Sequence, residues 1–132
     1  MNNKVKTKTI IIDGIPIPMK ISGATYLKFR NEFHEDMFAK LQKVNESEGR
    51  KNEEGQIEYQ LSGEAIETLL QIAYIMARQG TPTMETSFED WLDQFSFSGT
   101  MSEGLQGVLA MVNNDQETLE EAKKNTDQPQ DQ

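Results

Sequence analysis

The fold is decided first by residues 4–21, which read KVKTKTIIIDGIPIPMKI. Two runs of β-forming residues flank Asp13-Gly14, a two-residue turn in which glycine readily takes a positive φ. A turn at this point fixes the register of a β-hairpin, for example by placing Ile10 opposite Ile17. This register gathers the apolar side chains on one face, so the segment predicts a hairpin with one buried side.

Proline placement supports the same register. Pro16 and Pro18 fall at positions whose N–H groups would point away from the partner strand, so the hairpin loses no hydrogen bond. The outer edge of the second strand loses those donors, which hinders pairing with a further strand. A polyproline-like conformation over residues 15–18 is the alternative.

The next segment predicts one long helix over about residues 23–44, capped by Ser22. Apolar residues recur there at steps of three or four, as on one face of a helix: Tyr26, Phe29, Phe33, Met37, Leu41 and Val44. Leu27 and Phe38 lie off this stripe. Residues 45–54 predict a loop, and the alternation of Ile57, Tyr59 and Leu61 allows a third strand against the hairpin.

A second helix is predicted over residues 63–79, with Ser62 as its cap and Gly80 and Pro82 at its end. Apolar side chains occur on all its faces, which is typical of a helix at the centre of a domain.

Two short helices are predicted to follow, over residues 88–95 and 101–112. Ser87-Phe-Glu-Asp90 opens the first as a capping box, and Thr100 with Glu103 forms a second box. Gly104 and Gly107 each cost a helix about 1 kcal/mol relative to alanine, so the last helix must depend on packing or on a partner.

The sequence thus predicts a single α+β domain, mostly α, over residues 1–112: a hairpin at 4–21 followed by about four helices. Residues 113–132 are polar and predict a disordered tail.

Composition limits the function. The 132 residues carry a net charge of −9, contain no cysteine and include one histidine, His34. Disulfides, thiolate metal sites and a cysteine nucleophile are therefore excluded, and a Ser-His-Asp triad or a multi-histidine site is disfavoured. The acidic charge argues against nucleic acid, and the longest apolar run, Ile10–Ile12, is too short to cross a membrane. We expect a soluble cytosolic protein that is not an enzyme and uses no cofactor or metal.

Two clusters invite a chemical interpretation. Glu89, Asp90 and Asp93 could pair as acids or hold a metal, but helix capping and solvent exposure explain them more simply. Flexible methionines beside aromatic side chains suit either a core or a groove that binds helical partners, and both readings stay open. That set is Met76, Met84, Met101, Met111, Trp91, Phe95 and Phe97.

The order of these parts, and above all Ser87-Phe-Glu-Asp-Trp-Leu-Asp-Gln-Phe95, resembles the tail assembly chaperones of long-tailed phages and prophages of Gram-positive bacteria. The resemblance covers about residues 4–112. It implies a small cytosolic protein that binds the tape measure protein, keeps this long helical chain soluble and helps to bring tail tube subunits to it. Self-association is a further possibility.

The partner-binding residues are expected among apolar side chains that lie off the core stripes. Leu27, Phe38, Phe97 and Met111 meet that condition. The alternative function is that of an acidic regulatory protein that mimics nucleic acid and binds a basic protein.

Overall fold

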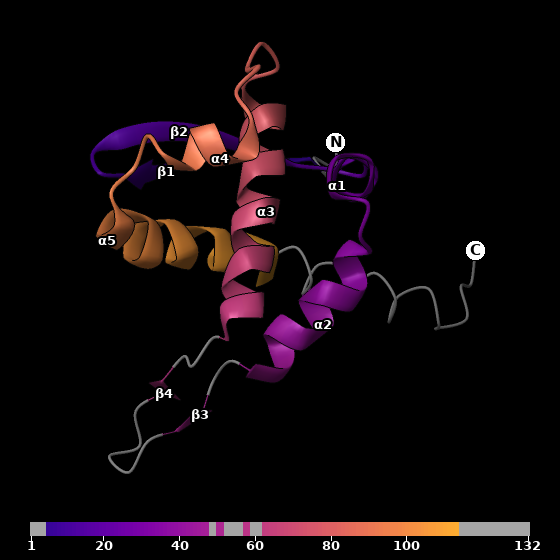
Figure 1. The fold of residues 1–132 in the computed structure, drawn as a ribbon, viewed down its shortest axis with the longest axis vertical. Coiled ribbons are helices and arrows are strands. Elements are labelled where there is room, and N and C mark those ends of the chain that lie inside the picture. The colour runs from indigo at the N-terminus through magenta and orange to yellow at the C-terminus, as the bar shows by residue number, and fades with distance from the viewer. Residues whose placement is uncertain (1–4, 48–49, 52–56, 59–61, 114–132) are drawn as a thin grey trace, which may run out of the picture.

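The computed structural model describes residues 5–47, 50–51, 57–58 and 62–113. An N-terminal β-hairpin is followed by helices, and the long helix α3 (Gly63–Gly80) stands at the centre with the other elements around it (Figure 1). The protein is therefore α+β and mostly α, as predicted.

The hairpin has the predicted register. Strand β1 (Lys6–Ile12) pairs antiparallel with β2 (Ile15–Ile21), from Lys6 opposite Ile21 to Ile12 opposite Ile15. Asp13 (φ 55°) and Gly14 (φ 76°) both have positive φ, which is the geometry of a type I′ turn. The extended β2 strand excludes the polyproline-like alternative. One face of the hairpin is buried, through Ile10, Ile12, Ile17, Met19 and Ile21.

The prediction of one helix over residues 23–44 is wrong, because the chain forms two helices, α1 (Thr25–Phe33) and α2 (Met37–Ser47). His34 takes the left-handed conformation (φ 59°), and its N–H donates to the Arg30 carbonyl at 2.8 Å, which ends α1. Asp36 then accepts the N–H of Phe38 at 3.0 Å at the start of α2.

The predicted apolar stripe still faces inward across this break, because both helices pack against α3. Its buried members are Phe29, Met37, Leu41 and Val44. The predicted cap Ser22 is also wrong: α1 begins at Thr25, and the Ser22 hydroxyl accepts the N–H of Ala24.

A third strand does not join the hairpin within the described residues. Instead β3 (Arg50–Lys51) and β4 (Ile57–Glu58) pair with each other in a separate two-stranded sheet. Tyr59 and Leu61, which belonged to the predicted strand, lie outside the described residues.

Helix α3 is central, as predicted. The Ser62 hydroxyl caps it by accepting the N–H of Ala65 at 3.1 Å, and residues 71–77 are buried without interruption. At its other end Gly80 touches the backbone of β2: a Cβ on Gly80 would overlap the Pro18 carbonyl group. This contact joins the end of α3 directly to the hairpin.

Helix α4 (Phe88–Leu92) is capped by Ser87, as predicted, but ends three residues before the expected boundary at Phe95. Its aromatic side chains pack around Tyr74 of α3. The ring centroids lie 5.5 Å apart for Tyr74 and Phe88 and 5.8 Å apart for Tyr74 and Trp91. The segment that carries the family resemblance therefore contributes to the core.

The last helix starts earlier than predicted. It runs from α5 (Phe97–Gly99) through the π-helical turn η1 (Thr100–Gly104) to residue 113, and Ser96 caps it by accepting the N–H of Gly99 at 3.0 Å. The predicted capping box of Thr100 and Glu103 is wrong, because the Glu103 carboxylate accepts the N–H of Asp13 at 2.9 Å.

Contact with the hairpin explains why this helix contains glycine at positions 104 and 107. A Cβ on Gly104 would lie 3.2 Å from the Ile12 side chain, and one on Gly107 would lie 2.8 Å from that of Ile10. The missing side chains let the helix approach β1, so packing within the domain offsets their helical cost. The predicted tail lies outside the described residues beyond position 113.

Candidate partner-binding surfaces

Three of the four predicted partner-binding residues are exposed. The exposed fractions are 55% for Leu27, 53% for Phe38 and 79% for Phe97. Large apolar side chains with this exposure are candidates for contact with another molecule when they occur together.

Leu27 and Phe38 belong to one surface on α1 and α2. The Phe38 ring stacks on Tyr26, with centroids 5.0 Å apart and planes inclined by 22°. In one unbroken helix these two residues would be about 18 Å apart along the axis. The break at His34 brings them together, and we call Tyr26, Leu27 and Phe38 the α1–α2 surface.

Phe97 lies elsewhere, at the turn of the hairpin. Helix α5 and the hairpin turn lie on one side of α3, and α1 and α2 lie on the other (Figure 1). Ser96 donates from its N–H and its hydroxyl to the Asp13 carboxylate, at 2.5 and 2.7 Å, and so holds Phe97 near the turn. Ile11 (55% exposed) and Ile15 (43%) occur at the same end of the molecule. We call Ile15 and Phe97 the hairpin-turn surface, whereas Ile11 lies on the opposite face of the hairpin.

Ile11 and Ile15 are not among the binding residues predicted from the sequence. A usable signal existed for Ile11, because the predicted register places it on the face opposite the buried isoleucines. Ile15 is in register with the buried face, and its place beside the turn explains its exposure.

Met111 is a wrong choice as an exposed residue, since its exposed fraction is only 4%. It lies one helical turn beyond Gly107 and two turns beyond Gly104, on the side of the helix that contacts β1. The hairpin packs closely against the two glycines, so the side of the helix that carries Met111 is buried. The pattern of apolar residues alone places the buried face elsewhere on the helix.

The proposed groove of methionine and aromatic side chains is also not present as a surface. Met76 and Trp91 are buried together with Met111, and Met84, Met101 and Phe95 are half-buried against the core. Phe97 alone of that set is largely exposed. The core interpretation is therefore correct for the buried members.

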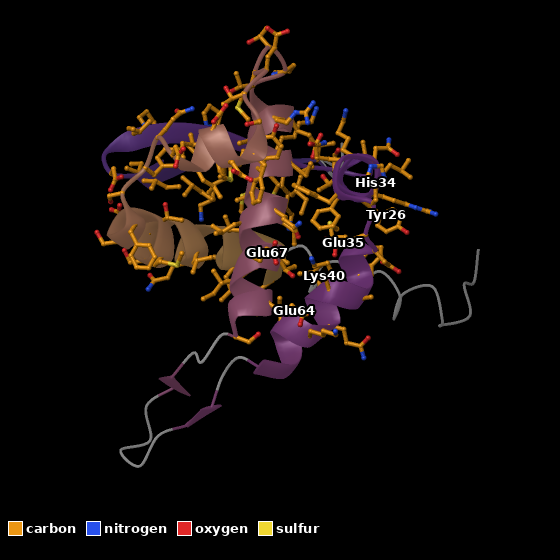
Figure 2. The ribbon with its side chains drawn as sticks, in the orientation of Figure 1. Tyr26, His34, Glu35, Lys40, Glu64 and Glu67 are labelled. Atoms are coloured by element: carbon orange, nitrogen blue, oxygen red, sulfur yellow. The ribbon has the colours of Figure 1, made fainter. Side chains whose placement is uncertain are left out.

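Beside the α1–α2 surface, a network of polar side chains joins α2 to α3. Lys40, whose side chain is 13% exposed, donates to Glu35 Oε1 and to Gln71 Oε1, both at 2.9 Å. Figure 2 labels Lys40 and Glu35. The hydrogen bond from Lys40 lowers the pKa of Glu35, although burial acts in the opposite direction and a hydrogen bond from Gln71 assists. The network fixes the start of α2 against α3, and with it the position of Phe38.

The residues considered for chemistry from the sequence have ordinary structural positions in the part that the structure describes. Those residues contain no group of three His, Cys, Asp or Glu side chains placed to hold a metal ion. Asp90 has its N–H bound by Ser87, and Glu89 and Asp93 are exposed. His34 is exposed at the end of α1.

Within the same residues, none of the helices has the length and apolar character needed to span a bilayer. No family model, curated protein or solved structure matches the chain.

Proposed function

We propose that this protein is a non-enzymatic tail assembly chaperone of a phage or prophage, acting in the bacterial cytoplasm. It binds the tape measure protein, keeps it soluble and helps to recruit tail tube subunits. The observation that carries the proposal is the exposure of Leu27, Phe38 and Phe97, each more than half accessible, on a small acidic domain.

The α1–α2 surface suits an amphipathic helix. Such helices bind through apolar anchors spaced along one face, and aromatic side chains provide large contact areas. Because Phe38 is already stacked on Tyr26, less side-chain freedom is lost when a partner covers it.

Two separate surfaces suit a protein with two kinds of partner. A helical client can cover the α1–α2 surface while a tube subunit, or a second copy of the chain, covers the hairpin-turn surface on the other side of α3 (Figure 1). The net charge of −9 then keeps a client coated with several copies dispersed.

The test is co-expression with the tape measure protein of the same phage or prophage. We expect the wild-type chain to keep the client in the supernatant, and Leu27→Ala/Phe38→Ala to lose most of this effect. Gln106→Ala, which changes an exposed polar residue of the last helix, is the matched control and should behave as wild type.

Phe97→Ala separates the two surfaces. It should leave the client soluble but reduce capture of tube subunits in a pull-down. A client that is equally soluble with and without the wild-type chain would contradict the proposed function.

A further inference from the structure

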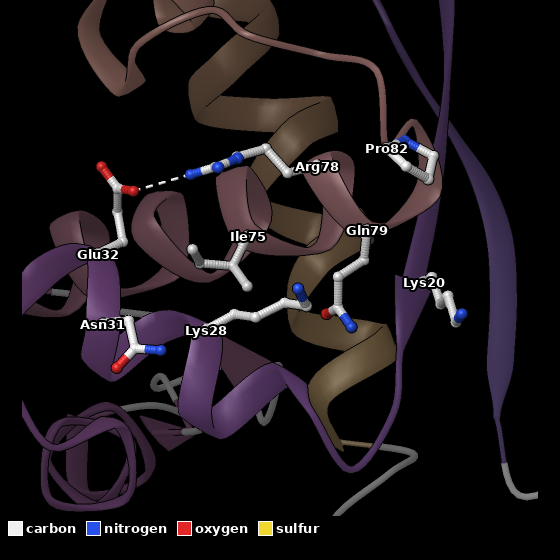
Figure 3. Close-up of a pocket in the computed structure, with 8 residues that line it drawn as sticks. All are labelled: Lys20, Lys28, Asn31, Glu32, Ile75, Arg78, Gln79 and Pro82. Atoms are coloured by element: carbon white, nitrogen blue, oxygen red, sulfur yellow. Dashed lines mark hydrogen bonds and ion pairs between the residues drawn. The ribbon is translucent and has the colours of Figure 1, made fainter.

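A cleft of about 480 Å³ lies between α1, the end of α3 and β2 (Figure 3). Lys28 and Glu32 line it from α1, Arg78 and Gln79 from α3, and Lys20 from β2. Ile75 and Pro82 add apolar surface. The cleft combines charged groups with an apolar wall, as sites for side chains of another protein do.

The charge of the cleft is opposite to that of the whole chain. Lys20, Lys28 and Arg78 stand against one carboxylate, that of Glu32, whereas the chain has a net charge of −9. Arg78 Nη1 is paired with Glu32 Oε1 at 2.7 Å. Among the residues that the structure describes, Lys20 and Lys28 have no ion-pair or hydrogen-bond partner for their ammonium groups. Two cations therefore remain available to a ligand.

The walls of the cleft are held in place before any ligand arrives. The Gln79 amide accepts from the Thr25 hydroxyl at 2.6 Å and donates to the Ser22 hydroxyl at 3.1 Å, which joins α3 to the start of α1. The close contact between Gly80 and Pro18 holds β2, and therefore Lys20, against the end of α3. Such preorganisation lowers the cost of binding.

We propose that this cleft binds the carboxylates of an acidic, amphipathic helix of a partner protein. Leu27 is four residues before Asn31, which lines the cleft, so the two are neighbours on the surface of α1. The α1–α2 surface thus borders the cleft, and one helix can place its apolar face on Leu27 and Phe38 while its acidic flank reaches Lys20 and Lys28. This inference rests on the proposed function in making the bound partner a helical client.

An acidic peptide fits better than a nucleic acid. Glu32 lines the cleft, and the chain as a whole is strongly acidic. A continuous phosphate backbone is therefore repelled both by Glu32 and by the net charge of the protein. A helix with carboxylates on one side only presents negative charge to the two lysines and apolar side chains to the remaining contacts.

The experiment measures binding of labelled helical peptides to the full chain by fluorescence anisotropy. One peptide carries leucines on one face and glutamates beside them, and a second has glutamine for every glutamate. We expect the glutamate peptide to bind more tightly, with an affinity that falls as salt is added.

Lys20→Gln/Lys28→Gln should weaken binding of the glutamate peptide by about tenfold, as expected for loss of two partly exposed ion pairs. Lys8→Gln removes one positive charge from β1 outside the cleft and is the control for the loss of a single lysine; it should bind as wild type. Unchanged thermal unfolding of both variants shows that folding is not the cause.

Equal binding of the two peptides would overturn the proposal, as would equal losses in the cleft and control variants. Tighter binding of a single-stranded oligothymidylate that depends on Lys20 and Lys28 would also overturn it, in favour of a nucleic-acid site. If the glutamate peptide binds as expected but the tape measure protein gains no solubility, the cleft assignment stands and the proposed function falls. If the cleft variant solubilises the client as well as wild type does and neither peptide binds more tightly, the proposed function stands and the cleft assignment falls.

Discussion

Ser96 and Asp13, far apart in the sequence, are joined by two hydrogen bonds: the Ser96 N–H and hydroxyl both donate to the Asp13 carboxylate. The Asp13 N–H in turn donates to Glu103 at 2.9 Å. Gly99 makes this contact possible, since a Cβ there would overlap the Asp13 carboxylate. The hairpin turn is thereby fixed to the start of the last helix.

This contact predicts a pH-dependent stability. The Ser96 N–H, and then its hydroxyl, lower the pKa of Asp13, with a smaller opposing effect of burial. Because the folded-state pKa lies below the unfolded value of 3.8, the contact stabilises the protein above that value and is lost as the pH falls through the folded-state pKa.

Asp13→Asn tests this effect, since asparagine also tolerates the positive φ at this position. We expect a lower thermal midpoint than wild type near neutral pH, and a difference that vanishes in acid. Glu35 also has a lowered pKa but titrates in both proteins, so the comparison removes its effect. A difference that persists unchanged in acid would contradict the assignment.

Gly80→Ala is predicted to destabilise the protein. The new methyl group would overlap the Pro18 carbonyl group, and backbone atoms cannot move aside as a flexible side chain can. We expect a loss of about 1–3 kcal/mol in urea unfolding. Gly63→Ala is the control in the same helix: nothing lies within 4 Å of its Cβ position, so its stability should equal or exceed that of wild type.

Lys40→Met is predicted to loosen α2. The substitution leaves the Gln71 side-chain oxygen, on a residue that is 5% exposed, without the Lys40 donor, and it removes the partner of Glu35. The expected cost in urea unfolding is about 1–3 kcal/mol.

Lys43→Met provides the comparison for Lys40. Its ion pair with Glu64 joins side chains that are 63% and 56% exposed, so we expect a change within about 0.5 kcal/mol. Equal effects of the two substitutions would show that the buried network contributes nothing beyond a surface pair.

The hairpin could be predicted from the sequence because its information is local. Asp13-Gly14 selects the turn, and the alternation of apolar residues on both sides agrees with a single register. The break between α1 and α2 was missed because Phe33 and Met37 keep the helical step of four across it, so the stripe reads as continuous. Asp36, a residue type favoured at helix starts, was the available signal.

The last helix shows what sequence patterns could not supply. Thr100 and Glu103 have the spacing of a capping box, but Glu103 has a partner distant in sequence, the N–H of Asp13, and Ser96 caps the helix instead. Exposure was predicted correctly for Leu27 and Phe38, because it follows from their position off the apolar stripe of the helix. Burial of Met111 depends on the hairpin packing against the two glycines, which no local pattern encodes.

Phe97 and Met111 therefore give opposite predictions although both lie off the predicted stripes. Phe97→Ala should change stability by no more than about 0.5 kcal/mol, because the side chain is 79% exposed. Met111→Ala should cost about 2–5 kcal/mol, as for other truncations in a core. Urea unfolding of the two variants measures both values. If Phe97→Ala proved as costly as Met111→Ala, the ring would have to be covered in the free protein, and the hairpin-turn surface could not be open to a partner.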